Sequence, residues 1–305
     1  MKKILLLLAA ASVAMSAMGA TGAMALSGSR VEESDRPGQP SPSRIEEFAV
    51  ESELLGVVKH CLVYLPAGYD ARPDKNYPVL YLLHGAGDDH TGWRDKGNVR
   101  QICDERIAAG LATAMIVVMP DASGQTAPDS PSHEGGTTKN RGYFDLPDWP
   151  YERHFFEELI PAVEERYRTV GDKRHRAVSG LSMGGGGTVG YAMHRPEMFS
   201  SAAPMSGALG GMSRATMTTD RNGDNFVAVV LLADARRIEA LKSVRWWVDC
   251  GDDDFLWEAN VDFLRAMRSR GVPLQFRMRD GGHTWSYWQS SLADVLTFVS
   301  AGFAE

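Results

Sequence analysis

The chain has 305 residues, 44% of them hydrophobic and 23% charged, and a formal net charge of -7. The acidic balance and the scattered basic residues exclude the positive surface that a nucleic-acid partner needs. The three cysteines, Cys61, Cys103 and Cys250, share no metal-ligand spacing, and they are compatible with one disulfide or with buried free thiols.

The N-terminus has the three-part layout of a secretory signal peptide. Lys2 and Lys3 precede the apolar run 4–13, and small residues follow it. We expect cleavage after Ala25, with Ala20 as the alternative, and therefore a secreted or periplasmic protein. A retained membrane anchor is disfavoured because the run is shorter than the roughly 20 residues that span a bilayer.

Residues 26–44 predict a flexible linker. They are rich in Ser, Pro, Gly and charge, and such a segment cannot bury enough apolar surface to become ordered. The remaining length, about 260 residues, suits one large α/β domain as well as two small ones. We expect a signal peptide over 1–25, a linker over 26–44 and a single domain over 45–305.

The first predicted strands differ from the later ones. Residues 48–65 alternate apolar and polar side chains in two stretches around Gly56, which predicts an antiparallel hairpin with one face toward water. The later strands are short apolar runs, typical of parallel strands buried on both faces. These runs are 79–83, 115–119, 177–179 and 246–248.

Helical patterns separate the predicted strands. Apolar residues recur at helical spacing over 155–167, where Pro161 predicts a kink, and over 261–267, which Gly271 and Pro273 end. The alternation predicts the α/β class: a mainly parallel central sheet with helices on both faces and an antiparallel hairpin at its N-terminal end. In such sheets, sites form at the carboxyl ends of strands.

A glycine-rich motif, G-L-S-M-G at 180–184, follows one of these strands. It matches the G-x-S-x-G nucleophile elbow in the strand-to-helix context that the elbow requires. Small residues must flank a serine that is held in a strained turn with its oxygen exposed. An incidental glycine-rich turn and a phosphate-binding loop are the alternatives, and the latter lacks its Lys-Ser/Thr ending. The motif predicts Ser182 as a nucleophile.

A serine nucleophile needs a histidine base that a carboxylate orients. In this fold the order along the chain is serine, acid, histidine, and only His194 and His283 follow Ser182. His194 lies within the helix expected after the elbow, whereas His283 lies in a turn before the last helix. We therefore predict His283 as the base. The acid comes from Asp252, Asp253 or Asp254, among which spacing alone does not choose.

An oxyanion hole needs the backbone amide after the nucleophile and one from the loop after an earlier central strand. Met183 supplies the first amide, and Ala86 in the sequence His84-Gly85-Ala86 supplies the second. We interpret His84 as a residue that shapes this loop rather than as a catalyst, because it precedes the nucleophile in the chain.

The long segment 123–150 lacks periodicity and is a candidate binding loop. Several tryptophans near motif ends offer flat rings that could stack on a sugar or phenolic ring, with core packing as the alternative for each. The candidates for substrate binding are Trp93, Trp149 and Trp285.

Six short motifs are spread from about Glu51 to the C-terminus: V-Y-L-P-A-G-Y at 63–69, Y-L-L-H-G at 81–85, E-L-I-P at 158–161 with Tyr167-Arg168, G-L-S-M-G-G at 180–185, V-D-C-G at 248–251 and G-H-T-W at 282–285. Together they resemble the putative-esterase family. This family holds feruloyl, acetylxylan and enterochelin esterases, S-formylglutathione hydrolases and the antigen 85 proteins.

The resemblance implies an α/β-hydrolase fold with Ser182 as nucleophile and His283 as base. The family pattern Cys-Gly-x-x-Asp falls on Asp254, with Asp253 as the second choice for the acid. In the family's oxyanion loop the residue after His-Gly donates its amide, which again is Ala86. Acyl transfer by these groups needs neither a metal nor an organic cofactor.

Within the family, this chain looks most like the carbohydrate-esterase branch that removes feruloyl or acetyl groups from plant xylan. We expect a secreted serine carboxylesterase that acts on an acylated oligosaccharide or another small ester, without nucleic acid or stable membrane insertion. The alternatives are an acyltransferase, an esterase of siderophores or other small esters, a peptidase, and a non-catalytic carbohydrate-binding protein. The last is disfavoured because every catalytic position holds a competent residue.

Overall fold

The computed structural model describes residues 41–124, 141–209 and 235–304. The predicted signal peptide, nearly all of the predicted linker and the middle of the candidate binding loop therefore lie outside the described residues. The first strand begins at Arg44, where the predicted linker ends. None of the helices in the described ranges combines the length and the apolar character needed to cross a bilayer.

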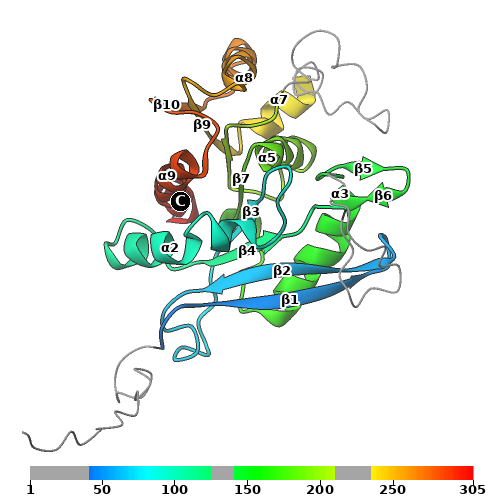
Figure 1. The fold of residues 1–305 in the computed structure, drawn as a ribbon, viewed down its shortest axis with the longest axis vertical. Coiled ribbons are helices and arrows are strands. Elements are labelled where there is room, and N and C mark those ends of the chain that lie inside the picture. The colour runs from blue at the N-terminus through cyan, green and yellow to red at the C-terminus, as the bar shows by residue number, and fades with distance from the viewer. Residues whose placement is uncertain (1–40, 125–140, 210–234, 305) are drawn as a thin grey trace, which may run out of the picture. The chain divides into compact units, whose positions relative to one another are not determined.

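An eight-stranded sheet forms the centre of the fold (Figure 1). In spatial order its strands are β1 (Arg44–Ser52), β2 (Val57–Leu65), β4 (Ile116–Pro120), β3 (Val79–Leu83), β7 (Arg176–Leu181), β8 (Ser201–Met205), β9 (Arg245–Gly251) and β10 (Gln275–Arg279). Every neighbouring pair from β4 to β10 is parallel, and β2 joins β4 antiparallel. The mainly parallel sheet predicted from the short apolar runs is confirmed.

The predicted hairpin is the antiparallel pair of β1 and β2, which runs along one edge of the sheet (Figure 1). Ser52 is opposite Val57 at the tight end, and the amide of Gly56 donates to the Ser52 carbonyl at 2.9 Å. Gly56 has a φ of 66°, a left-handed conformation that glycine adopts without the steric cost of a side chain. The turn chemistry thus fixes the register of the hairpin.

Helices cover both faces of the sheet. Successive residues of a strand point to opposite faces, so each buried strand contributes side chains to two buried clusters. On β3, Tyr81 and Leu83 belong to one buried cluster and Leu80 and Leu82 to the other. The helical segments are α1 (Gly92–Asp95), α2 (Val99–Ala108), α3 (Tyr151–His154), α4 (Ile160–Arg166), α5 (Met183–His194), α7 (Ala235–Leu241), α8 (Trp257–Ser269) and α9 (Trp285–Ala304), with a short hairpin of β5 (Asp145–Leu146) and β6 (Trp149–Pro150) before α3.

The helix predicted over 155–167 contains a wide turn where a kink was expected. A π-helical turn over Phe155–Leu159 connects α3 to α4, and Pro161 lies in the first turn of α4. Proline has no amide hydrogen and its ring crowds the preceding turn, so a regular α-helix cannot run through it without adjustment. The wide turn provides this adjustment.

One central strand, β8, has no counterpart among the predicted runs. Its sequence S-A-A-P-M has small residues and a proline, which have low strand propensity. It pairs with β9 at Ser201, Ala202 and Met205, whereas Pro204 has no partner in the described residues of β9. The neighbours on both sides place this segment in the sheet, which local pattern alone could not reveal. All three cysteines are free and buried.

Candidate active site

Ser182 lies at the sharp turn between β7 and α5 and has a φ of 53° and a ψ of -115°. The flanking glycines make this turn possible. A Cβ atom on Gly180 would lie 2.6 Å from the Leu83 Cβ, and one on Gly184 would lie 2.6 Å from the His84 carbonyl oxygen. Since both approaches are too close for any side chain, only glycine fits at these positions. The strand-to-helix context of the elbow is present.

Three side chains from three strand ends meet in a line at this turn. The His283 Nε2 atom lies 2.9 Å from the Ser182 Oγ atom. The His283 Nδ1 atom lies 3.0 Å from Oδ1 and 2.8 Å from Oδ2 of Asp254. Ser182 and Asp254 are buried, whereas 18% of the His283 side chain is exposed. The arrangement has the geometry expected of a serine nucleophile, a histidine base and a carboxylate that orients the base.

The three adjacent aspartates have different surroundings. Only Asp254 contacts His283; Asp252 and Asp253 are exposed. A side-chain oxygen of Asp252 accepts from the Gly281 amide at 3.1 Å, and the Asp253 amide donates to the Gly281 carbonyl at 3.1 Å. The two exposed residues therefore attach the acid loop to the turn that carries His283.

Burial acts to raise the pKa of the Asp254 carboxyl, but hydrogen bonds outweigh it and the net pKa is below its usual value. The donors are His283, the Leu256 amide and the Ser206 hydroxyl. A carboxyl group that stays ionised in a buried position can fix the imidazole tautomer and stabilise an imidazolium.

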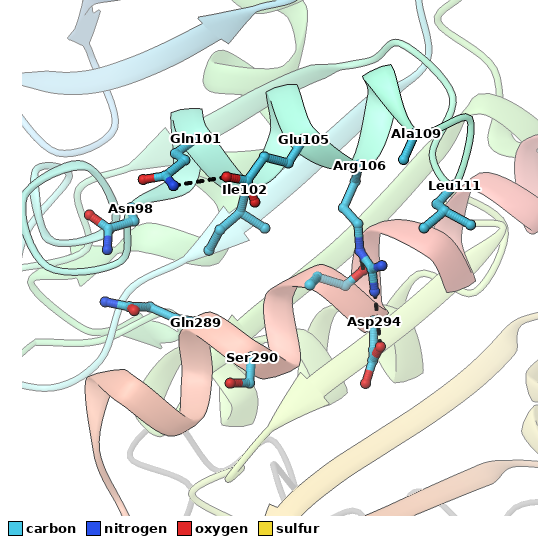
Figure 2. A pocket seen from close by; sticks show the side chains of 11 residues that line it. Asn98, Gln101, Ile102, Glu105, Arg106, Ala109, Leu111, Gln289, Ser290 and Asp294 are labelled. Atoms are coloured by element: carbon cyan, nitrogen blue, oxygen red, sulfur yellow. Dashed lines mark hydrogen bonds and ion pairs between the residues drawn. The ribbon is translucent and has the colours of Figure 1, made fainter.

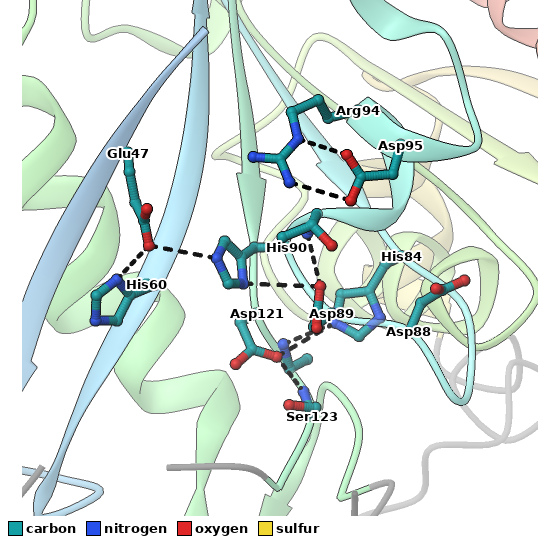
Figure 3. Close-up of polar contacts among 12 residues, drawn as sticks. Glu47, His60, His84, Asp88, Asp89, His90, Arg94, Asp95, Asp121 and Ser123 are labelled. Carbon is teal, nitrogen blue, oxygen red and sulfur yellow. Dashed lines mark hydrogen bonds and ion pairs between the residues drawn. The ribbon is translucent and has the colours of Figure 1, made fainter. Parts of the chain in front are cut away.

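The loop after β3 is fixed by a neutral histidine (Figure 3). The His84 Nε2 atom accepts the Ala122 amide at 2.9 Å, so the proton is on Nδ1, which donates to the Gly85 carbonyl at 2.8 Å. Burial lowers the pKa of His84, which keeps it uncharged. The Tyr143 hydroxyl donates to the His84 carbonyl at 3.0 Å. His84 thus shapes the loop, as its position in the sequence suggested.

The two predicted oxyanion donors belong to two segments that meet at Ser182: Met183 follows the serine directly, and Ala86 lies in the loop after β3. A Cβ atom on Gly85 would lie 3.5 Å from the Ser182 Cβ, so the loop passes beside the serine. Ala86 follows and is exposed, and Met183 is the first residue of α5 and half-buried. In the described part of the chain neither amide donates to a protein acceptor. The two amides remain the predicted donors to a substrate oxygen.

Ser206, at the end of β8, supports the acid side of the site. Its φ is 44°, an unusual value for a residue other than glycine. Its amide donates to the Asp249 carbonyl at 2.6 Å, and its hydroxyl accepts from the Trp288 indole at 3.1 Å. Ser206 was not among the predicted site residues, because β8, which it follows, has no local strand pattern.

A buried asparagine on α8 secures the turn after Ser206. The Asn260 side chain accepts from the Gly207 amide at 3.1 Å and donates to the Gly207 carbonyl at 2.9 Å. The next amide, of Ala208, donates to the Ser182 carbonyl at 2.8 Å. Asn260 lies on the buried face of the helix with Phe263 and Met267, and a polar residue on such a face was the signal available in the sequence.

The turn that carries His283 is supported by a buried polar network. The Tyr287 hydroxyl donates to Asp249, and the Arg279 guanidinium lies 2.5 Å from the other Asp249 oxygen. Burial raises the pKa of Asp249. A Cβ atom on Gly281 would lie 2.8 Å from the Tyr287 ring, so this ring fixes the path of the turn.

The three candidate tryptophans lie in different surroundings. Trp93 is fully buried and donates to the Leu83 carbonyl at 3.1 Å, and Trp149 is 5% exposed and stacks on Tyr151. Only Trp285 reaches the surface, half-buried with its ring 5.2 Å from that of Trp93. Core packing therefore accounts for Trp93 and Trp149, since neither ring faces the solvent.

Two other features could hold a ligand. Among the described residues, only Asp252, Asp253 and Asp280 bring three potential metal ligands within 4.8 Å of one another, and all three are exposed. A groove of about 530 Å³ lies between α2 and α9 and has both polar and apolar lining residues, and Arg106 crosses it to Asp294 at 3.1 Å (Figure 2). None of the candidate triad or oxyanion residues lines this groove.

The chain is similar to known esterases in sequence and in structure. Residues 52–299 match the model of a family described as Putative esterase. An endo-1,4-beta-xylanase/feruloyl esterase of Xylanibacter ruminicola is 36% identical over 166 residues, which are 53% of this chain and 21% of that protein. The chain thus spans about a fifth of that relative's length.

Two further matches extend over most of the chain. An acetyl esterase of Caldicellulosiruptor saccharolyticus is 25% identical over 282 residues, which cover 82% of this chain and 95% of that protein. A solved structure described as a ferulic acid esterase is 39% identical, with a TM-score of 0.76, and covers 86% of this chain and 99% of its own. The α/β-hydrolase fold is shared with these esterases.

Proposed function

This chain belongs to the putative-esterase family, and we propose that it is a serine carboxylic ester hydrolase that uses Ser182, His283 and Asp254. One observation carries the proposal: Asp254, His283 and Ser182 are joined by contacts of 2.8 Å and 2.9 Å. These distances allow the imidazole to take a proton from the serine hydroxyl while the carboxylate holds it in place.

The first step forms an acyl-enzyme. His283 Nε2 accepts the hydroxyl proton as Ser182 Oγ attacks the ester carbonyl, and the carbonyl oxygen becomes an oxyanion. The amides of Met183 and Ala86 donate to this oxyanion, where removal of one such donor typically slows an enzyme about 100- to 1,000-fold. The imidazolium then gives its proton to the leaving alcohol oxygen, and the carbon–oxygen bond of the ester breaks.

The second step releases the acid. Water binds where the alcohol left, His283 takes one of its protons, and the resulting hydroxide attacks the acyl carbon. The second oxyanion collapses, the bond to Ser182 Oγ breaks, and the imidazolium returns the proton to the serine. These residues and water account for every proton and electron pair in the cycle.

For the substrate we infer feruloyl or acetyl groups esterified to a plant cell-wall polysaccharide such as xylan. The matches to a xylanase/feruloyl esterase, to a ferulic acid esterase and to an acetyl esterase support this choice.

The sequence of residues 1–25 supports export to the periplasm or medium. Mass spectrometry of the protein recovered from the periplasm or the medium tests whether the signal peptide has been removed. An intact N-terminus on the exported protein would contradict the predicted cleavage.

The test is the release of ferulate and of acetate from feruloylated and acetylated xylo-oligosaccharides by the purified protein. We expect release with the parent protein and none above background with Ser182→Ala. Release that persists in Ser182→Ala would refute the mechanism. Transfer of the acyl group to an added alcohol, in place of hydrolysis, would identify an acyltransferase.

A further inference from the structure

An exposed aromatic ring lies beside the histidine of the site. Four large apolar side chains are exposed among the described residues, and Phe255 is the most exposed of them at 77%. Its ring centroid lies 4.5 Å from that of His283, with the planes inclined by 51°. Trp288 also packs on this imidazole, at 4.7 Å, but it is only 6% exposed. Phe255 is thus the solvent-facing neighbour of His283.

The position of Phe255 is fixed by the residues on both sides of it. The Asp254 carboxylate accepts from the Leu256 amide at 2.8 Å, and the Asp254 carbonyl accepts from the Trp257 amide at 2.8 Å. The turn that carries the ring therefore has a defined conformation. Folding alone does not account for the ring, since burial in the core would stabilise the protein more than exposure does.

The reaction geometry decides which part of a substrate meets this ring. The carbonyl oxygen must face the amides of Met183 and Ala86, whereas the alcohol oxygen must come within hydrogen-bond reach of His283 to receive its proton. A group that stands beside the imidazole and faces the solvent therefore contacts the alcohol part of the ester.

We propose that Phe255 is a specificity-determining residue, a flat platform for the sugar ring that carries the ester. The inference rests on the proposed function and adds the binding site for the alcohol part of the substrate. The apolar face of a sugar ring packs on the phenyl ring while the sugar hydroxyls stay in water. Aromatic side chains bury a large area and dominate the energetics of such contacts.

The experiment compares two esters with the same acyl group and different alcohols: methyl ferulate and a feruloylated arabinoxylo-oligosaccharide. We expect Phe255→Ala to lower kcat/KM for the sugar ester about 5- to 10-fold, mainly through KM. The value for methyl ferulate stays near that of the parent protein, because methanol is too small to reach the platform. The acetyl ester of the same sugar loses as much as the feruloyl ester.

Three further variants sharpen the test. Phe255→Trp keeps a flat ring and retains the preference for the sugar ester, whereas Phe255→Leu keeps apolar character without a flat face and loses it. Leu111→Ala removes another exposed apolar side chain, one that lines the groove between α2 and α9, and leaves both esters unaffected.

Other outcomes reject the inference. An equal loss on methyl ferulate and the sugar ester, or a shifted pH profile, would mean that Phe255 acts through His283. A loss confined to feruloyl esters, whatever their alcohol, would put the ring on the acyl side. An unchanged sugar ester would show that the platform has no function. If the parent protein hydrolyses neither ester, the proposed function itself fails.

Discussion

The two sides of the candidate site are held by different kinds of interaction. On the acid side, the turn that carries His283 adjoins a network of ionisable groups, in which Arg279 and Tyr287 both contact the buried Asp249 and the Tyr287 ring packs against Gly281. On the oxyanion side, the loop at Gly85 is held by the neutral His84, whose Nε2 atom accepts from the Ala122 amide and lies 3.7 Å from Asp121, a residue paired with Lys59. The acid side must move protons, whereas the oxyanion side needs only fixed dipoles. In the proposed mechanism, the proton transfers therefore occur in the half of the site that holds Asp254 and His283.

The largest expected effect comes from the acid side. Asp254→Asn keeps the shape of the carboxylate but cannot hold the imidazole in the required tautomer, so kcat should fall about 1,000- to 10,000-fold. Asp253→Asn is the matched control, since the Asp253 side chain is exposed and does not contact His283. Steady-state kinetics on methyl ferulate measures both. Similar losses in the two variants would contradict the distinct role of Asp254.

A smaller effect is expected on the oxyanion side. His84→Ala leaves the Gly85 carbonyl and the Ala122 amide without their partner. The loop should lose its fixed shape, so kcat falls about 100-fold, and the unfolding free energy falls by about 1–3 kcal/mol. Tyr143→Phe removes only the hydrogen bond to the His84 carbonyl and should cost less in both measurements. If His84→Ala retained full activity, the fixed-dipole interpretation would be wrong.

The hydrogen bonds around the turn that carries His283 provide a third test. Tyr287→Phe removes the hydroxyl that donates to Asp249 and retains the ring that packs against Gly281. Because Arg279 still pairs with Asp249, we expect the unfolding free energy to fall by about 1 kcal/mol, with only a small change in kcat. Urea denaturation and kinetics on the same sample separate the two. A large loss of kcat at unchanged stability would show that the hydroxyl itself aligns His283.

The smallest effect concerns pH. The folded pKa of the buried His84 is lowered, so the unfolded chain binds its proton first as the pH falls. Its contribution to stability is fully present above the usual histidine pKa of about 6.5 and is lost as the pH falls through the folded value. The loss is at most about 1.4 kcal/mol per pH unit, the limit for one proton.

Urea denaturation between pH 5 and pH 8, for the parent protein and for His84→Gln, isolates this contribution. Glutamine does not titrate, so the difference in unfolding free energy between the two proteins should narrow as the pH falls. A constant difference over this range would mean that His84 does not remain neutral in the folded protein.

The parts of the fold that the sequence predicted are those with strong local patterns. The hairpin around Gly56 and the apolar runs of β3, β4, β7 and β9 are all present. The missed strand β8 consists of small residues and Pro204, and only its neighbours make it a strand. The aromatic residues give a second example. Position in the sequence did not reveal that the candidates Trp93 and Trp149 are buried, or that Phe255, which was not a candidate, is exposed.

By itself the sequence determined the glycine-rich elbow motif at Ser182, the candidate histidine at 283 and the alternation of strands and helices, since each depends on residues that are close together in the chain. Spacing left three adjacent aspartates open and the family resemblance favoured Asp254, but only the tertiary structure shows that Asp254 contacts His283. It also revealed the support from Ser206 and Asn260. The physical reason is that hydrogen-bond distances between strand ends depend on how β7, β8 and β9 pack side by side, and no local pattern encodes that packing.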